Sequence, residues 1–434
     1  MNVIRLNSIS LKIMFSIILL WPPIIFLLTW LFDNKGILTI SYVADLVILA
    51  LVLIQQKSKR SIIMQLVAVA FLLCIGLYGN FSKNNLIFAL HYYFALSILL
   101  LLSKKNYDLS NLKRVIIYNL KLFFLCQAIF FIVVATYVMK NGFYEGWGTM
   151  VLKGPFDHPH TLAYFMFFYI AADLFLLSNK KNIVWLVLFA FSFELLVLTG
   201  VRSAFLATIF LILFYMFYMI KKREKRIIVF LLCSFLVLGI VNHYFKVTDV
   251  LVDKTANALS QTEYLKERSL DYLKKSKLKT AAQTAAQTAA QTADQTADLT
   301  FLERFYDKIV FIDALSNCRA SILISSFSSL WVDAQSWSKK ITCGIGLDPI
   351  MKTNLKNLYM NIHAHNDFAD IVIAFGVICL IIYCLSFLTF STGNVVITLL
   401  TLGLLAFMNG YFMYFHCTFM IIYLRMLFES ANCK

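Results

Sequence analysis

The stretch that decides the fold is HAHNDFADIVIAFGVICLIIYCLSFLTF, residues 363–390. Its second part is an apolar run of helical length, which is the pattern of a membrane-spanning helix. Its first part places two histidines and an amide, His363, His365 and Asn366, at the mouth of that helix. Ionisable side chains are costly next to a membrane core. Their presence indicates that a polar molecule binds or reacts at this position.

The composition of the whole chain fits the same class of protein. Of its 434 residues, 60% are hydrophobic and only 14% are charged, whereas soluble domains have about 25% charged residues. The apolar segments have helical length and do not show the ten-residue alternation of a β-barrel. We therefore expect an all-α, polytopic integral membrane protein. The first apolar segment lacks a small-residue cleavage site after it, so we expect it to be retained as a span.

The apolar runs predict about twelve transmembrane helices and one long loop. The expected spans are residues 12–32, 37–55, 62–80, 86–102, 115–138, 161–178, 182–200, 203–220, 227–245, 366–390, 395–409 and 411–428. The chain then divides into helices 1–9 (residues 1–245), a loop (246–365) and helices 10–12 (366–434).

The distribution of charge predicts the orientation of these helices. The net charge of +16 comes from basic clusters near residues 57–60, 104–114, 180–181 and 221–226, in every second short loop. This is the positive-inside pattern, which reports orientation in a membrane and does not indicate nucleic acid. Both termini are then cytoplasmic. The loops at 139–160, 200–202 and 246–365 are then external.

The long loop contains a tandem TAAQ repeat at residues 280–298. The repeat has no apolar side chain larger than alanine and cannot bury a core, so we interpret it as a spacer without chemistry. Residues 309–331 are fairly apolar but are interrupted by Asp313, Asn317 and Arg319. We expect an interfacial or re-entrant helix there, because central charges are costly in lipid. If this segment spanned the membrane, His365 would lie on the other side.

Arg202 stands in a short turn that contains Gly200, between two predicted spans. A helix-end arginine commonly extends to the lipid headgroups. The alternative is a guanidinium that binds a phosphate or diphosphate with its planar fork. Because the positive-inside rule disfavours an external arginine, we favour the second interpretation.

His365 and Asn366 leave a similar choice. A single histidine near a helix end is often structural, but an imidazole can also take a proton from a sugar hydroxyl near neutral pH. His363 lies two residues earlier and farther from the predicted helix, so we favour His365. Gly376, farther along the same predicted helix, would allow close packing against a neighbour.

A third polar turn precedes the span at 161–178, with Asp157 and His158 between two prolines and His160 directly after the second. The prolines fix a turn and Thr161 could cap the helix, which would be a purely structural role. A role in binding is equally compatible with these residues, and His160 is then the strongest candidate. The nine cysteines are scattered, without a CxxC pair or metal-ligand spacing, so we expect no structural metal and no disulfide framework.

Several of these features follow one another along the chain and lie on the same predicted side of the membrane. In chain order they are the turn at residues 154–159, Arg202 with Leu206, the Gly344-Ile345-Gly346 turn after Arg319, and His365-Asn366 with Gly376. In this order the chain resembles the O-antigen ligase and polymerase superfamily of bacterial inner-membrane glycosyltransferases, over roughly residues 140–390. It departs from the pattern at Cys379, where a second glycine is usual, and in the TAAQ insertion.

The resemblance implies transfer of a glycan from an undecaprenyl-diphosphate carrier to a glycan acceptor at the periplasmic face, by a metal-independent, inverting reaction without a cofactor. In that frame Arg202 and Arg319 would hold the departing diphosphate, and His365 would orient or deprotonate the attacking hydroxyl. Asp157, His158, His160, His363 and Asn366 would bind substrate. Membrane lipids and a chain-length regulator are the other expected partners.

The leading hypothesis is a polymerase of O-antigen, capsule or related repeat units. An O-antigen ligase that transfers glycan to lipid A–core is the alternative within the same family. A transporter or flippase is the alternative of another class. A transporter is expected to place charges at the bilayer midplane and to show internal repeats. Here the candidate residues cluster at the predicted outer face, and the two halves of the chain show no obvious repeat.

Overall fold

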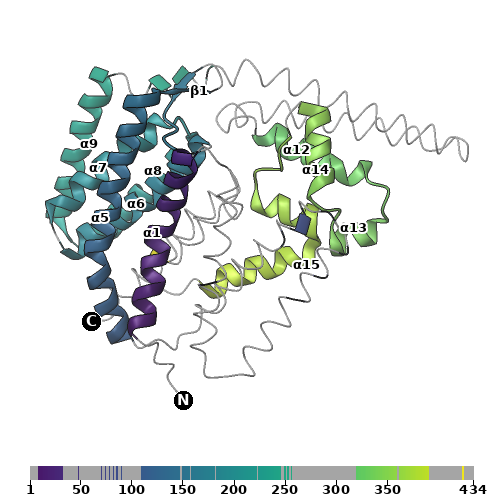
Figure 1. Ribbon diagram of the computed structural model, residues 1–434, viewed down its shortest axis with the longest axis horizontal. Coiled ribbons are helices and arrows are strands. Elements are labelled where there is room, and N and C mark those ends of the chain that lie inside the picture. Colours follow the sequence, from purple (N-terminus) through teal and green to yellow (C-terminus); the bar gives the residue numbers. More distant parts are fainter. Residues whose placement is uncertain are drawn as a thin grey trace, which may run out of the picture.

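The computed structural model describes residues 8–32, 109–146, 149–156, 158–180, 182–221, 223–245, 319–358 and 361–390, and single positions between 47 and 89, between 249 and 256, and at 423 and 424. Figure 1 shows two groups of helices. The left-hand group comprises α1 (Ser8–Phe32), α5 (Leu109–Asn141), α6 (Pro159–Lys180), α7 (Ile183–Leu198), α8 (Arg202–Lys221) and α9 (Lys225–Phe245). The right-hand group comprises α12 (Arg319–Val332), α13 (Trp337–Cys343), α14 (Leu347–Leu358) and α15 (Asp367–Phe390).

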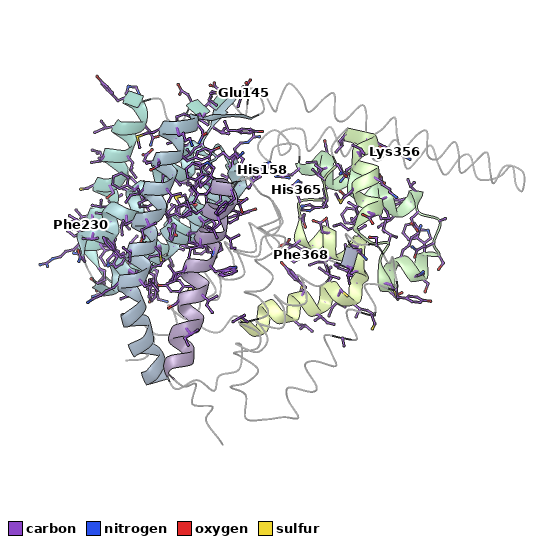
Figure 2. The ribbon with its side chains drawn as sticks, in the orientation of Figure 1. Glu145, His158, Phe230, Lys356, His365 and Phe368 are labelled. Carbon is purple, nitrogen blue, oxygen red and sulfur yellow. The ribbon has the colours of Figure 1, made fainter. Side chains whose placement is uncertain are left out.

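Five of the described helices are long and apolar enough to cross a membrane. They are Leu120–Asn141, Pro159–Leu177, Arg202–Lys221, Lys225–Tyr244 and Asp367–Leu385, and α7 and the end of α1 are shorter apolar helices. The outer helices expose large apolar side chains: on α9, Leu236 is 66% exposed, and Phe230 points away from the bundle in Figure 2. Such a surface is suited to lipid. The chain is therefore a helical membrane protein.

The five helices fall on predicted spans, and α1 and α7 match two more. The predicted spans at 37–55, 62–80, 86–102, 395–409 and 411–428 lie almost wholly outside the described residues, as does the TAAQ repeat. Of the segment 309–331, only residues 319–331 are described, within α12, so the interfacial or re-entrant helix stays a prediction.

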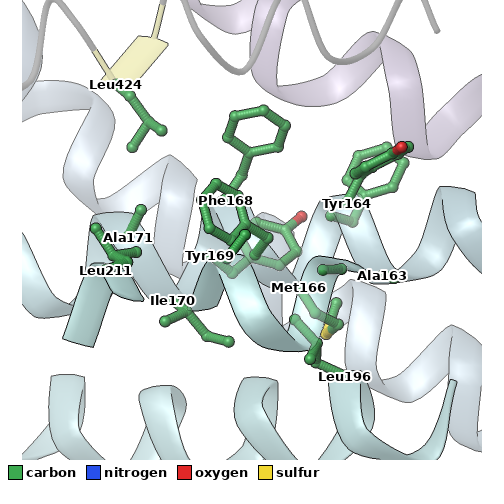
Figure 3. Close-up of a cluster of buried hydrophobic side chains, with 14 of the residues drawn as sticks. Ala163, Tyr164, Met166, Phe168, Tyr169, Ile170, Ala171, Leu196, Leu211 and Leu424 are labelled. Atoms are coloured by element: carbon green, nitrogen blue, oxygen red, sulfur yellow. The ribbon is translucent and has the colours of Figure 1, made fainter. Parts of the chain in front are cut away.

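α6 is the central helix of the left-hand group. Its residues from 159 to 174 are all buried, which is expected of a helix that is apolar on nearly every side, with Asp173 among its few buried polar residues. The ring of Phe165 lies 5.0 Å from that of Phe130 on α5 and 5.9 Å from that of Phe26 on α1. Figure 3 shows α6 side chains packed beside Leu196 of α7 and Leu211 of α8.

Short turns decide which residues share an end of this bundle. At the start of α7, Asn182 accepts a hydrogen bond from the N–H of Val184 at 3.0 Å, which caps the helix. At its end, the chain turns through Gly200, whose φ of +62° favours glycine. The N–H of Leu152 donates to the carbonyl of Leu198 at 2.8 Å. The start of α6, the end of α7 and the start of α8 therefore lie together.

The predicted external loop at 139–160 contains a small hairpin that the all-α expectation missed. Strands β1 (Tyr144–Gly146) and β2 (Thr149–Val151) pair antiparallel, with Glu145 opposite Met150. The hairpin leads directly into the turn before α6.

In the right-hand group, α12 and α14 pack through small polar side chains. The Nδ2 of Asn354 donates to the Oγ of Ser326 at 2.8 Å, and the Nδ2 of Asn357 donates to the Oγ of Ser325 at 2.8 Å. Serines at a helix interface let the two backbones approach closely. This contact fixes the start of α12, where Arg319 stands.

α15 is not the uninterrupted helix that the sequence predicted, because it breaks at Gly376, where φ is 85° and ψ is 175°. A break removes the helical partners of the carbonyl groups just before it. The N–H groups of Ile345 and Gly346 replace them, donating to the carbonyls of Ile373 and Ala374 at 2.8 and 3.0 Å. Backbone groups inside a membrane protein need such partners. The turn at 344–346 and the helix break thus form one unit.

The close packing expected at Gly376 is confirmed. A Cβ atom at Gly376 would lie 2.4 Å from the carbonyl oxygen of Thr342, and one at Gly344 would lie 2.3 Å from the carbonyl carbon of Ala374. Because neither glycine has a side chain, the backbone at residues 341–344 and the backbone of α15 at residues 374–376 can pack directly against each other.

Candidate functional site

Three distant segments converge between the two groups of helices. They are the start of α6, with His158 and His160; the start of α12, with Arg319; and the turn before α15, with His363 and His365. Figure 2 shows His158 and His365 facing one another, one from each group. The prediction that these polar residues meet is supported by the contacts described next.

The guanidinium of Arg319 joins α12 to α6. Its Nη2 lies 3.4 Å from the Nε2 of His160, a residue 159 positions away. Because a guanidinium only donates hydrogen bonds, the Nε2 of His160 accepts and the proton of that ring resides on Nδ1. The ring of His158 stacks on that of His160, with centroids 4.7 Å apart and an angle of 9° between the planes.

The local sequence explains how the two imidazoles are held. Pro159 is the first residue of α6, a position for which its fixed φ is suited. The N–H of Thr161 bonds to the carbonyl of His158 at 3.1 Å. The expectation that Thr161 caps the helix is therefore wrong, because α6 begins two residues before it. His160 is buried, and His158 is exposed.

In the turn before α15, His363 is paired with an aspartate. The Nδ1 of His363 lies 2.6 Å from the Oδ2 of Asp370, and the Oδ1 of Asp370 accepts from the N–H of Ala364 at 2.8 Å. Asp370 is fully buried in the first turn of α15. Its carboxyl group therefore holds both the ring and the backbone of the turn.

His365 lies in a constrained position in the same turn. Its φ is +53°, a left-handed conformation that few residues other than glycine adopt. Its ring is 4.3 Å from that of His363, and its buried Nδ1 has no hydrogen-bond partner within the described part of the chain. Burial and then the charge of Arg319, with smaller contributions from the other imidazoles, lower the pKa of His365 well below its usual value. The ring is therefore neutral at physiological pH.

Asn366, expected to bind substrate, has a structural role. Its Oδ1 accepts from the N–H of Ala369 at 3.0 Å, and its carbonyl accepts from the N–H of Asp370 at 2.8 Å. This is the pattern of a helix N-cap. Asn366 thus fixes where α15 begins and where His365 and Asp370 lie.

Arg202 is the first residue of α8, at the same end of the bundle as His160. Its side chain is buried, with 7% of the residue exposed, whereas an arginine that extends to lipid headgroups would be exposed. Among the described residues, the groups that lower the pKa of His365 are Arg319 and three histidines, and Arg202 is not one of them. Asp157 lies outside the described residues.

Asp370 is the residue that the sequence analysis missed. Its signal is present in the sequence: an aspartate in the first turn of an apolar helix needs a polar partner, and His363 stands seven positions before it. Within the described ranges, no three His, Cys, Asp or Glu side chains are grouped so as to hold a metal ion. The site consists of one guanidinium, four imidazoles and one carboxyl group.

Comparison with known proteins gives no relative: no family model, no curated protein and no solved structure matches the chain.

Proposed function

We propose that the chain is a bacterial inner-membrane glycosyltransferase that polymerises oligosaccharide repeat units carried on undecaprenyl diphosphate. Its twelve spans place both termini in the cytoplasm and the long loop in the periplasm. The site described above then opens at the periplasmic face, and the product is an O-antigen, capsule or related polysaccharide.

One observation carries this proposal. A guanidinium and four imidazoles, from segments up to about two hundred residues apart, converge at the ends of apolar, membrane-length helices. Basic residues flank the opposite end: α6 ends at Lys180, α8 ends at Lys221 and α9 begins at Lys225. By the positive-inside rule that end is cytoplasmic, so the cluster would face the periplasm, where the proposed transfer takes place.

The chemistry of the cluster suits an anionic donor. Arg319, with Arg202 at the same end of the bundle, supplies fixed positive charge for a diphosphate whose negative charge grows as it departs. The N-terminus of α6 adds partial positive charge in the same place. The imidazoles of the 363–366 turn supply groups that can orient or deprotonate a sugar hydroxyl.

The break in α15 bears on the transporter alternative, because broken helices line the binding sites of many transporters. In those sites the carbonyl groups freed by the break coordinate the transported ion. Here the carbonyls of Ile373 and Ala374 are bonded to the N–H groups of the 344–346 turn. These two carbonyl groups therefore already have hydrogen-bond partners within the protein, which favours the enzyme over the transporter.

The proposal is tested with the purified protein in lipid vesicles. The donor is the undecaprenyl-diphosphate-linked oligosaccharide that accumulates in cells lacking this protein. We expect elongated, lipid-linked chains, with loss of product in Arg319→Ala. Lys221→Ala, at the other end of the bundle, is the matched control and should remain active. A product formed only on added lipid A–core would identify a ligase, and movement of the donor across the vesicle membrane without a new bond would identify a flippase.

The orientation is tested separately with reporter fusions. Fusions after Arg60, Arg114, Lys181 and Arg226 should report the cytoplasm, and fusions within 280–300 should report the periplasm. A cytoplasmic signal from 280–300 would place the cluster on the wrong face for this reaction.

A further inference from the structure

The turn before α15 contains two histidines, and the structure treats them differently. The sequence favours His365, because it stands next to Asn366 and the helix. In the structure it is His363 that has a carboxylate partner, at 2.6 Å from Asp370. The Nδ1 of His365 is buried without a partner among the described residues.

Asp370 determines which nitrogen of His363 carries the proton. An ionised carboxylate only accepts hydrogen bonds, so the 2.6 Å contact requires a proton on Nδ1. The backbone N–H of His365 also lies 3.1 Å from this Nδ1. It cannot donate to a nitrogen that already bears a proton, so the shorter, charge-assisted contact prevails. The Nε2 of His363 is then unprotonated.

The surroundings of His363 leave Nε2 available. The side chain of His363 is 14% exposed, whereas that of Asp370 is fully buried. No described residue forms a hydrogen bond with Nε2 of His363, since both polar contacts of this ring involve Nδ1. The ring is thus held through Nδ1, and its Nε2 has no hydrogen-bond partner among the described residues.

A proton has different consequences on the two rings. On His363 the resulting imidazolium would be stabilised by the carboxylate of Asp370. On His365 it would be opposed by burial and by the positive charge of Arg319. A general base must hold the proton that it accepts, and in the part of the chain that the structure describes only His363 has a carboxylate beside it, so His363 is the better acceptor.

We propose that His363 and Asp370 form a catalytic dyad, in which Nε2 of His363 accepts the proton of the attacking hydroxyl and Asp370 is the positioning residue. The inference rests on the proposed function. The hydroxyl oxygen bonds to the anomeric carbon of the donor as the bond from that carbon to the diphosphate breaks. The diphosphate leaves with the electron pair, the proton passes to Nε2, and it is released to water after the product departs. Neutral His365 lies beside the dyad and positions the reactants.

The decisive variant is Asp370→Asn, which keeps an oxygen for the N–H of Ala364. Its amide nitrogen would face Nδ1 of His363 and force the proton onto Nε2, so the ring could no longer accept one there. We expect kcat to fall by about 10²–10⁴-fold with little change in the KM for the donor. Asp367→Asn is the matched control: Asp367 is also buried in the first turn of α15 but accepts from Tyr383 at 3.3 Å, and its variant should keep most activity.

The pH dependence separates the two histidines. In the wild type, transfer should rise with pH and then level off as the base loses its proton. This rise should disappear in His363→Gln and persist in His365→Asn, since asparagine tolerates a positive φ. His363→Gln leaves Asp370 its bond to Ala364 and carries the test if Asp370→Asn does not accumulate.

Each failure has a distinct signature. Activity of Asp370→Asn near the wild-type level would reduce Asp370 to a structural support of the turn. A pH-dependent rise that survives in His363→Gln and is lost in His365→Asn would make His365 the base and overturn the dyad, while the proposed function stands. Absence of any transfer by the wild-type protein from the lipid-linked donor would overturn both.

Discussion

Replacing Gly376 with alanine should destabilise the protein more than any other glycine-to-alanine change in the described helices. With φ at 85° and ψ at 175°, Gly376 occupies a region that is essentially closed to other residues and costs them about 1–3 kcal/mol. The added Cβ would also lie 2.4 Å from the carbonyl oxygen of Thr342 and 2.7 Å from that of Ile341. These atoms belong to the backbone and cannot rotate away.

The collision has two possible outcomes, and both are unfavourable. If the segments stay in place, overpacking costs about 1–3 kcal/mol. If they separate, the hydrogen bonds from Ile345 and Gly346 to α15 are lost, at about 1 kcal/mol each. Together with the backbone cost, the expected loss is about 4 kcal/mol, the sum of about 2 for conformation and about 2 for the contact.

The measurement is thermal unfolding of the detergent-purified protein, with two glycine controls. A Cβ at Gly142 or at Gly239 would meet no atom within 4 Å. Gly142 has a φ of +72°, so Gly142→Ala isolates the backbone cost, whereas Gly239 lies within α9 and its alanine variant should be as stable as the wild type or slightly more so. Gly376→Ala should unfold at the lowest temperature of the three.

Gly344 provides a second test of the same contact. A Cβ there would lie 2.3–2.5 Å from the backbone of Ala374 and Phe375, so Gly344→Ala should be about as destabilising as Gly376→Ala. Because both act on one contact, the double variant should lose clearly less than the sum of the single losses. Equal stability of Gly376→Ala and Gly239→Ala would refute the close backbone contact at Gly344 and Gly376.

Three further predictions address charge and the long loop. Burial and Arg319 lower the pKa of His365, so below about pH 6.5 the unfolded chain binds a proton that the folded chain does not bind. The free energy of unfolding should therefore decrease as the pH is lowered, by at most about 1.4 kcal/mol per pH unit. The same decrease in His365→Asn would contradict this. Arg202→Ala should abolish polymer formation at normal membrane levels, and Arg202→Lys should restore little, because a point charge cannot reproduce bidentate contacts; a fully active lysine variant would refute a diphosphate fork. Deletion of residues 284–291 should leave polymer length and yield unchanged in cells, and loss of product would give the repeat a role.

The helices were predictable because a membrane restricts the alternatives. Length and apolar character suffice to locate a span, so the predictions for 115–138, 161–178, 203–220 and 227–245 agree with α5, α6, α8 and α9. The break in α15 was not predictable from apolar length, because the run continues through Gly376 without a polar residue. It depends on the turn at 344–346, which supplies the missing donors from some thirty positions away.

The convergence of the candidate site was predictable only in part. Alternating charge placed His160, Arg202 and the 363–366 turn on one predicted face, and the structure brings His160 and the turn together through Arg319. Sidedness, however, says nothing about distance along the membrane plane. It therefore could not say which of these residues lie in contact with one another.

The choice between His363 and His365 shows where reasoning from sequence stops. His365 stands nearer to the helix, but its positive φ of 53° reverses the chain there and carries the ring of His363 toward Asp370. An extended or helical residue at 365 would direct the two preceding residues elsewhere, so the dyad depends on a backbone conformation that is uncommon outside glycine. A change of His365 to alanine would therefore disturb the position of His363 as well as remove an imidazole. Loss of activity in that variant alone would identify neither ring as the base, whereas asparagine, which accepts the same backbone conformation, removes the imidazole and leaves the dyad in place.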